Sequence, residues 1–263
     1  MNRRKFLVIS ATSLGGLLIS GAAYRIFRPS DPLDPFRKST KKVLTARFGK
    51  SRADEMMNNI KATYAGIAPS VPDIGGKQSM CTEWLDSGVY YLAVYRVLKQ
   101  AGYSIDQIGE IIYRTYETMA DYPKWLLNLV GRLKYSESYM SRLKAAAAES
   151  QNRRYPASWV FTFVEGNGGE FDYGLDFTEC GICKFYAAHQ AMELAPYMCL
   201  SDFVINEAFN KGLVRYHTIA EGSDRCDFRF KAGSKTFVYP LRNGWPPQFL
   251  KNKNIIWSGR GAK

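Results

Sequence analysis

The residues best suited to chemistry gather in one short stretch of this chain. Four of its five cysteines (Cys180, Cys183, Cys199 and Cys226) fall within the 47 residues from 180 to 226, together with both histidines. Several carboxylates lie in or beside the same stretch. A thiolate is a strong nucleophile and a metal ligand, and a nearby cation or base makes it available near neutral pH. The search for function therefore begins in this segment.

Three interpretations of these thiols remain open from the sequence. A disulfide framework would suit an exported protein, but five cysteines leave one unpaired. A metal site would use the Cys180-x-x-Cys183 pair with Cys199 and Cys226, or with His217 in place of one thiol, and would take zinc or another divalent metal. The irregular spacing leaves the metal unknown. A catalytic site would use one thiol as a nucleophile, with a carboxylate and an imidazole nearby.

Asp202 and His217 are the side chains expected to work with the thiols. Asp202 follows Cys199 by three residues in a predicted helix, which places the thiol and the carboxylate on one face. Burying both without a role would cost free energy. His217 stands in a predicted strand and lies near Cys226 if the two predicted strands pair. We expect Cys180, Cys199 and Cys226 to converge on one pocket, with the fifth cysteine outside it.

The elements that must position these residues follow from the pattern of apolar residues. Residues 41–150 read as a helical region, in which Ser104 and Gln107 are spaced as a capping box. We expect helices at 40–64, 82–100, 105–116 and 126–149.

From residue 151 the pattern changes to one typical of strands. Alternating apolar and polar residues predict a hairpin, followed by two helices and two more strands. The expected strands are 159–164, 171–178, 213–219 and 226–230, and the expected helices are 181–192 and 195–210. This order predicts an α+β fold, in which an N-terminal helical region packs on a small antiparallel sheet with two inserted helices. We expect the α+β domain core to span residues 151–240 and a basic C-terminal tail to follow at 241–263.

Residues 1–24 have the pattern of a targeting segment. Arg3 and Arg4 precede an uncharged run over residues 6–23 that is rich in Gly, Ser and Ala. This order is typical of an export signal, and the paired arginines are typical of one read by the twin-arginine machinery. Because 18 uncharged residues barely span a bilayer, an uncleaved membrane anchor stays open. We expect an exported, periplasmic or extracytoplasmic protein, with a proline-containing linker at 25–40.

The charge distribution argues against a nucleic-acid partner. The formal net charge is +12, and residues 231–263 carry seven basic and no acidic groups. Residues 151–230 carry seven basic and 11 acidic groups. A nucleic-acid binder concentrates its positive charge on one folded face, whereas here the segment with the motifs is acidic. We therefore expect a small-molecule substrate and no nucleic acid.

Several short motifs follow one another between residues 179 and 230. They are Glu179-Cys180, Cys199-x-x-Asp202, Arg215-x-x-Thr218 and Cys226-Asp227-Phe228. In this order and combination they resemble the L-2-amino-thiazoline-4-carboxylic acid hydrolase family, over about residues 155–232. The helical region before them is similar only in character.

The resemblance implies hydrolysis of a small ring that contains a C=N carbon and carries a carboxylate. Either Cys199 or Cys180 would attack that carbon, Asp202 would relay the proton, and Arg215 would hold the carboxylate. The expected catalytic residues are Cys199, Asp202, Cys180 and Cys226. The expected substrate-binding residues are Arg215, Thr218 and His217. A metal-activated water is the alternative mechanism, and a non-catalytic small-molecule, metal-binding or redox module is the alternative function.

Export can be tested with the two arginines alone. Replacing both Arg3 and Arg4 by lysine should leave the protein in the cytoplasm, because the twin-arginine machinery recognises its substrates by the paired arginines. Cell fractionation of the double variant measures this. The matched control replaces Arg25 and Arg28 with lysine and should be exported normally. Normal export of the first variant would contradict the assignment.

Overall fold

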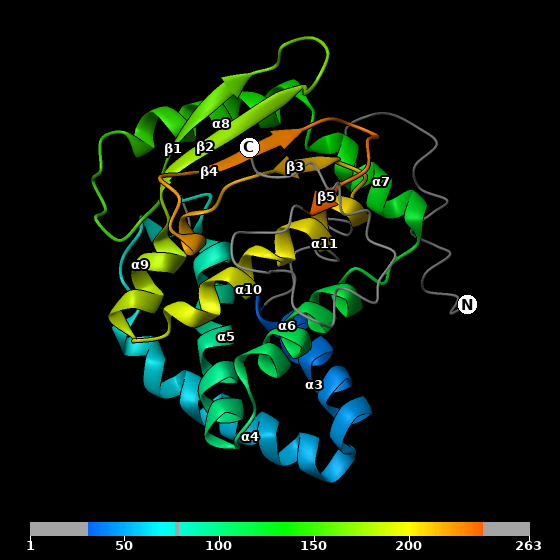
Figure 1. Cartoon of the computed structure of the whole chain (residues 1–263), viewed down its shortest axis with the longest axis vertical. Helices are drawn as coiled ribbons and strands as arrows, with labels where there is room; N and C mark the ends of the chain where they lie inside the picture. Colours follow the sequence, from blue (N-terminus) through cyan, green and yellow to red (C-terminus); the bar gives the residue numbers. More distant parts are fainter. Residues whose placement is uncertain (1–30, 77–78, 239–263) are drawn as a thin grey trace.

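The computed structural model describes residues 31–76 and 79–238, which form the predicted α+β fold (Figure 1). Helices α3 to α6 make up one part of the molecule, and a five-stranded sheet lies at the opposite end with α8 packed along it. Helices α9, α10 and α11 lie between these two parts. The residues expected to do chemistry come from this middle layer and from the strands that face it.

The helical region holds six α-helices and one 3-10 turn within the described residues. They are α3 (Asp34–Phe48), α4 (Lys50–Ile67), η1 (Ala68–Ser70), α5 (Thr82–Gln100), α6 (Ile105–Met119), α7 (Lys124–Leu133) and α8 (Glu137–Ser150). Helix α5 has the predicted bounds, and residues 87–95 within it are all buried. The capping box is confirmed, because Ser104 and Gln107 exchange both hydrogen bonds at the start of α6.

The linker predicted at 25–40 is wrong in its described portion. Residues 34–40 belong to helix α3, because Pro35 occupies the first turn, where its missing N–H breaks no helical hydrogen bond. The predicted signal at 1–24 and the basic tail at 241–263 lie outside the described residues. Among the helices that the structure describes, none is long and apolar enough to cross a membrane.

Two predicted helices are each divided in two. The helix predicted at 40–64 breaks at Gly49, whose φ of 80° is a conformation that favours glycine and ends α3. The helix predicted at 126–149 breaks before Ser136, whose side chain accepts the backbone N–H of Tyr139 and caps α8.

The sheet has the strand order β1-β2-β4-β3-β5. Its strands are β1 (Val160–Glu165), β2 (Tyr173–Glu179), β3 (Leu213–Arg215), β4 (Cys226–Phe230) and β5 (Phe237–Val238). The pairs are antiparallel, as predicted, except that β5 runs parallel to β3. Strand β3 ends four residues earlier than the predicted 213–219, because the backbone N–H groups of Tyr216 and His217 donate to the Asp227 carboxylate instead of continuing the strand.

Three short α-helices and one 3-10 turn join β2 to β3, where two longer helices were predicted. They comprise α9 (Gly181–Ala188), the 3-10 turn η3 (Met192–Leu194), α10 (Ala195–Cys199) and α11 (Ser201–Ala208). The helix predicted at 195–210 is thus interrupted at Leu200, which lies between α10 and α11. A further 3-10 turn, η4 (Ile219–Glu221), precedes β4.

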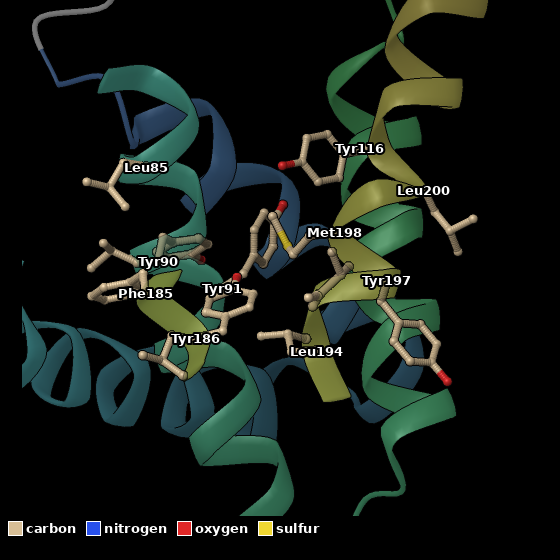
Figure 2. Close-up of a cluster of buried hydrophobic side chains, with 14 of the residues drawn as sticks. Leu85, Tyr90, Tyr91, Tyr116, Phe185, Tyr186, Leu194, Tyr197, Met198 and Leu200 are labelled. Carbon is tan, nitrogen blue, oxygen red and sulfur yellow. The ribbon is translucent and has the colours of Figure 1, made fainter. Parts of the chain in front are cut away.

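The middle layer is fixed to the helical region by a core rich in tyrosine. Figure 2 shows these side chains filling the space between α5, α6, α9 and α10. Tyr186 of α9 is fully buried, and its hydroxyl donates to the backbone carbonyl of Gly88 at 2.9 Å. Tyr91 and Tyr116 place their ring centroids 5.4 Å apart. The buried hydroxyl of Tyr186 therefore fixes α9 against α5 at a defined register.

Gly109 controls how closely α10 approaches α6. A Cβ at this position would lie 1.8 Å from Cδ1 of Tyr197, whose hydroxyl donates to Asp106 and holds the ring against the helix. Gly109→Ala should therefore lower the free energy of unfolding by about 1–3 kcal/mol, the usual cost of overpacking. Urea denaturation measures the change.

The matched control is Gly66→Ala, at an exposed position of α4 where an added Cβ meets no atom within 4 Å. It should raise the free energy of unfolding by about 0.5–1 kcal/mol, because alanine loses less backbone entropy than glycine in a helix. A loss of stability in both variants would contradict close packing at Gly109.

Candidate active site

Arg215, the last residue of β3, belongs to one of the motifs and is only 1% exposed. Its guanidinium donates to Oδ2 of Asp202 at 2.6 Å and to the backbone carbonyl of Cys199 at 2.9 Å. The rings of Phe203 and Phe228 lie 4.8 and 4.9 Å from its Cζ atom. The charge is thus neutralised on one edge and covered by aromatic faces, both of which stabilise a buried guanidinium.

These bonds fix the junction between α10 and α11. The carbonyl at the end of a helix lacks a partner within that helix, and Arg215 supplies one for Cys199 at the end of α10. Asp202 lies in the first turn of α11. One side chain of the sheet therefore holds the end of one helix and the start of the next. Cys199 and Asp202, predicted to share one helix, belong instead to two helices separated at Leu200.

The structure brings four thiols together around this junction. Cys199, Cys183 and Cys226 each lie close enough to other thiols of the group to raise one another's pKa. Burial is the largest cause for two of them: it raises the pKa of Cys226 to about 12 and that of Cys199 well above its ordinary value. The Cys226 thiol also accepts the backbone N–H of Ile219 at 3.2 Å. These two thiols are therefore protonated and unreactive at neutral pH.

Cys180 differs from the other thiols of the group. It is the N-cap residue of α9. The neighbouring Cys183 thiol lowers its pKa, burial opposes this, and the backbone N–H groups of Cys183 and Ile182 at the start of the helix lower it further. The pKa of Cys183 is raised, first by its interaction with the Cys180 thiol and then by burial. A thiolate at a helix N-terminus is also favoured by the helix dipole. Cys180 is thus the activated thiol among the four.

Asp202 lies near these thiols, and its charge opposes the ionisation of Cys180 and Cys199. Its side chain remains 37% exposed, and burial among protein atoms is the largest cause that raises its pKa, against the opposing charge of Arg215. Cys180 and Cys199 are half-buried.

Thr218 and Glu221 form a second polar pair next to Arg215. Thr218 is 1% exposed, and its hydroxyl donates to Oε2 of Glu221 at 2.6 Å. Burial raises the pKa of Glu221 to about 7, partly offset by the hydrogen bond from Thr218 and by the charge of Arg215. Glu221 was not among the predicted site residues. The Thr218-x-x-Glu221-Gly222 spacing is the signal that marks it, because Gly222 closes the turn in the left-handed conformation.

His217 lies apart from the thiols. Its ring Nδ1 lies 2.9 Å from Oδ2 of Asp227, and its side chain is 51% exposed. Asp227 follows Cys226 in β4, and successive side chains of a strand point to opposite faces. His217 therefore contacts Asp227, the residue after Cys226, rather than the Cys226 thiol. The role of His217 in substrate binding stays a prediction. The other histidine, at position 189, lies beside Ser70 and Arg96, away from this site.

Cys81 lies closer to the group than expected. It is buried, which raises its pKa to about 12, and the neighbouring Cys180 raises it further. All five cysteines are free thiols, so the structure contains no disulfide framework. Over residues 31–76 and 79–238, no group of three or more His, Cys, Asp or Glu side chains is arranged to hold a metal ion.

An open surface groove lies elsewhere, between α3 and α6, with a volume of about 670 Å³. It is lined mostly by charged side chains, including Lys42, Arg47, Glu110 and Arg114. None of the thiols or their partners contributes to it. We place the candidate site at the thiols, because the groove offers no nucleophile.

The site gathers thiols, a carboxylate and a buried guanidinium within an α+β fold, and these are groups that nucleophilic hydrolysis can use. Residues 87–230 match the family model of L-2-amino-thiazoline-4-carboxylic acid hydrolase, and the chain belongs to this family. The match covers 144 of the 263 residues and extends from within α5 to the end of β4. It therefore includes helices as well as the thiol segment. No curated protein and no solved structure matches the chain.

The thiols should differ in their rates of alkylation. Iodoacetamide should modify Cys180 before the other four cysteines, because its pKa is lowered and its thiol is half-buried. A thiolate is the reacting form, so its rate should rise with pH and level off at a lower pH than that of an ordinary thiol. Peptide mass spectrometry over a pH series measures this. Buried Cys81 is the internal control, and faster labelling of Cys199 than of Cys180 would contradict the assignment.

Proposed function

We propose that this protein is an exported, thiol-dependent hydrolase that opens a C–N bond of a small cyclic amidine of the thiazoline type. Membership of the hydrolase family supports the reaction class. The observation that carries the mechanism is the position of Cys180 as N-cap of α9, where the Cys183 thiol and the backbone at the start of the helix lower its pKa against the opposing effect of burial. A nucleophile of lowered pKa is what attack on a C=N carbon requires.

The reaction begins when the Cys180 thiolate adds to the ring C=N carbon and the ring nitrogen takes up a proton. Asp202 relays that proton from water, a role that its raised pKa favours, and returns to the carboxylate that pairs with Arg215. When the ring C–N bond breaks, the bonding electrons leave with the ring nitrogen, which takes a second proton from the exocyclic nitrogen and becomes an amine, while the carbon stays attached to the Cys180 sulfur. Water then adds to this carbon, its protons pass to the exocyclic nitrogen and to solvent, and the C–S bond to Cys180 breaks to release the thiolate and a carbonyl product. Cys199 and Cys226 form no bond to the substrate.

Arg215 has a different role from the one that the resemblance implies. Both terminal nitrogens of its guanidinium donate to protein groups, so it positions Asp202 and the α10 end rather than gripping a substrate carboxylate with both of them. Its Nε atom has no hydrogen-bond partner within the described residues. We propose that Nε faces the carboxylate end of the substrate, with Thr218, whose hydroxyl donates to Glu221, beside it and His217 at the edge of the site.

The N-terminal segment completes the proposal. Arg3, Arg4 and the uncharged run after them support export through the twin-arginine machinery, with the run either cleaved or retained as a membrane anchor. The hydrolase then acts on its small-molecule substrate outside the cytoplasm.

The nucleophile can be identified with L-2-amino-thiazoline-4-carboxylic acid as the substrate. Cys180→Ala should lower kcat/KM at least about a hundredfold, the scale of losing a nucleophile or its acid–base partner. Asp202→Asn should approach the same loss, and the double variant should lose little more, because residues that act as a unit are not additive. Initial rates on the purified full-length chain measure all three.

Cys81→Ala is the matched control, since it removes a buried thiol outside the proposed chemistry, and it should keep its rate. Loss of turnover in Cys199→Ala with activity retained in Cys180→Ala would assign the nucleophile to Cys199 instead. Binding of the substrate without turnover by the unaltered protein would show a non-catalytic module.

A further inference from the structure

Cys180, the nucleophile of the proposed hydrolysis, is paired in sequence with Cys183, a thiol that the proposed hydrolysis does not use. Cys180 caps α9, and Cys183 lies within the first turn of the same helix. Residues three apart at the start of a helix place their side chains side by side. The interaction between the two thiols is also the largest cause of the lowered pKa of Cys180 and of the raised pKa of Cys183, so the two thiols lie beside each other.

The two sulfurs also differ in accessibility. Cys180 is half-buried, whereas Cys183 is 8% exposed. An incoming reagent therefore meets Cys180 first, and Cys183 can react only with what Cys180 has bound. This division between an attacking and a resolving thiol is typical of dithiols that exchange with disulfides.

We propose that Cys180 and Cys183 form a dithiol redox site that is oxidised reversibly to an intramolecular disulfide by low-molecular-weight disulfides of the glutathione type. The proposal does not depend on hydrolysis. If the hydrolase mechanism above is also right, oxidation removes its nucleophile.

The exchange balances in two steps. The Cys180 thiolate attacks one sulfur of the small disulfide, which forms a mixed disulfide and releases the first small thiolate. Cys183 then loses its proton and attacks the Cys180 sulfur, which forms the intramolecular bond and releases the second small thiol. The protein dithiol gives up two electrons, and one small disulfide becomes two small thiols.

The first step prepares the second. The largest cause of the raised pKa of Cys183 is its hydrogen bond to Cys180. A mixed disulfide at Cys180 carries no charge, so this cause disappears once the first step has occurred. Cys183 then ionises more easily when it has to attack.

Cys183 is a better partner for Cys180 than the remaining thiols. The backbone of Cys199 is held in place because its carbonyl accepts a hydrogen bond from Arg215. Cys226 is held within the sheet, where it is paired with Phe177. A disulfide needs Cα atoms about 4.4–6.8 Å apart, a range that positions i and i+3 of one helical turn satisfy without movement of either element.

The test equilibrates the full-length chain in buffers of reduced and oxidised glutathione, stops exchange with acid, and alkylates the free thiols. Intact mass should show the loss of two hydrogen atoms in one reversible transition, with peptides that link Cys180 to Cys183. Cys183→Ala should lose the intramolecular disulfide and accumulate a glutathione adduct on Cys180. Cys81→Ala removes an equally buried thiol near Cys180 and should oxidise with a midpoint within about twofold of the unaltered chain.

A disulfide from Cys180 to Cys81, Cys199 or Cys226, or a Cys183→Ala variant that still forms an intramolecular disulfide at Cys180, would overturn the proposal. So would a Cys180 that stays reduced across the whole series. None of these readouts requires a substrate, so they separate failure of the redox site from failure of the proposed hydrolysis.

Discussion

A guanidinium group shut away from water is the constraint on which the candidate site depends. Arg215 is 1% exposed, and a buried charge without partners costs several kcal/mol. Its acceptors are the Asp202 carboxylate and the Cys199 carbonyl, both supplied by the helices inserted before β3. Their positions are thus set by the need to neutralise Arg215. The same bonds hold the Cys199 backbone and the Asp202 carboxylate at the junction between α10 and α11, so the requirement for stability and the geometry of the site have one cause.

The thiols of this site differ in pKa because they occupy different positions in the fold. Burial keeps Cys199 and Cys226 protonated, whereas the start of α9 supplies Cys180 with hydrogen-bond donors. Desolvation favours the neutral thiol and hydrogen bonds favour the thiolate. In the proposed hydrolysis, having one reactive thiol among inert ones prevents several thiols from competing for the C=N carbon of the substrate. It also leaves Cys183 free to act as the partner that an oxidant would engage.

Much of the fold, and less of the site, could be predicted from the sequence. Helix α5, the Ser104 capping box and the β1–β2 hairpin follow local rules, so the local pattern was sufficient. The break at Leu200 was missed because it depends on Arg215, which lies 15 residues further along the chain and acts through space. Spacing alone also left Cys180 and Cys199 equivalent as nucleophiles. Only the three-dimensional neighbours of each thiol distinguish them, and the exposed place of His217 depends in the same way on Asp227.

The central claim is that Arg215 and Asp202 are energetically coupled within the fold, and a double-mutant cycle tests it most directly. The free energy of unfolding is measured for the unaltered chain, for Arg215→Met, for Asp202→Asn and for the double variant. The account predicts a coupling energy of about 1–3 kcal/mol, the scale of interacting buried groups. The double variant should therefore be more stable than the sum of the single losses implies. A coupling energy below about 0.5 kcal/mol, typical of an exposed ion pair, would contradict the account.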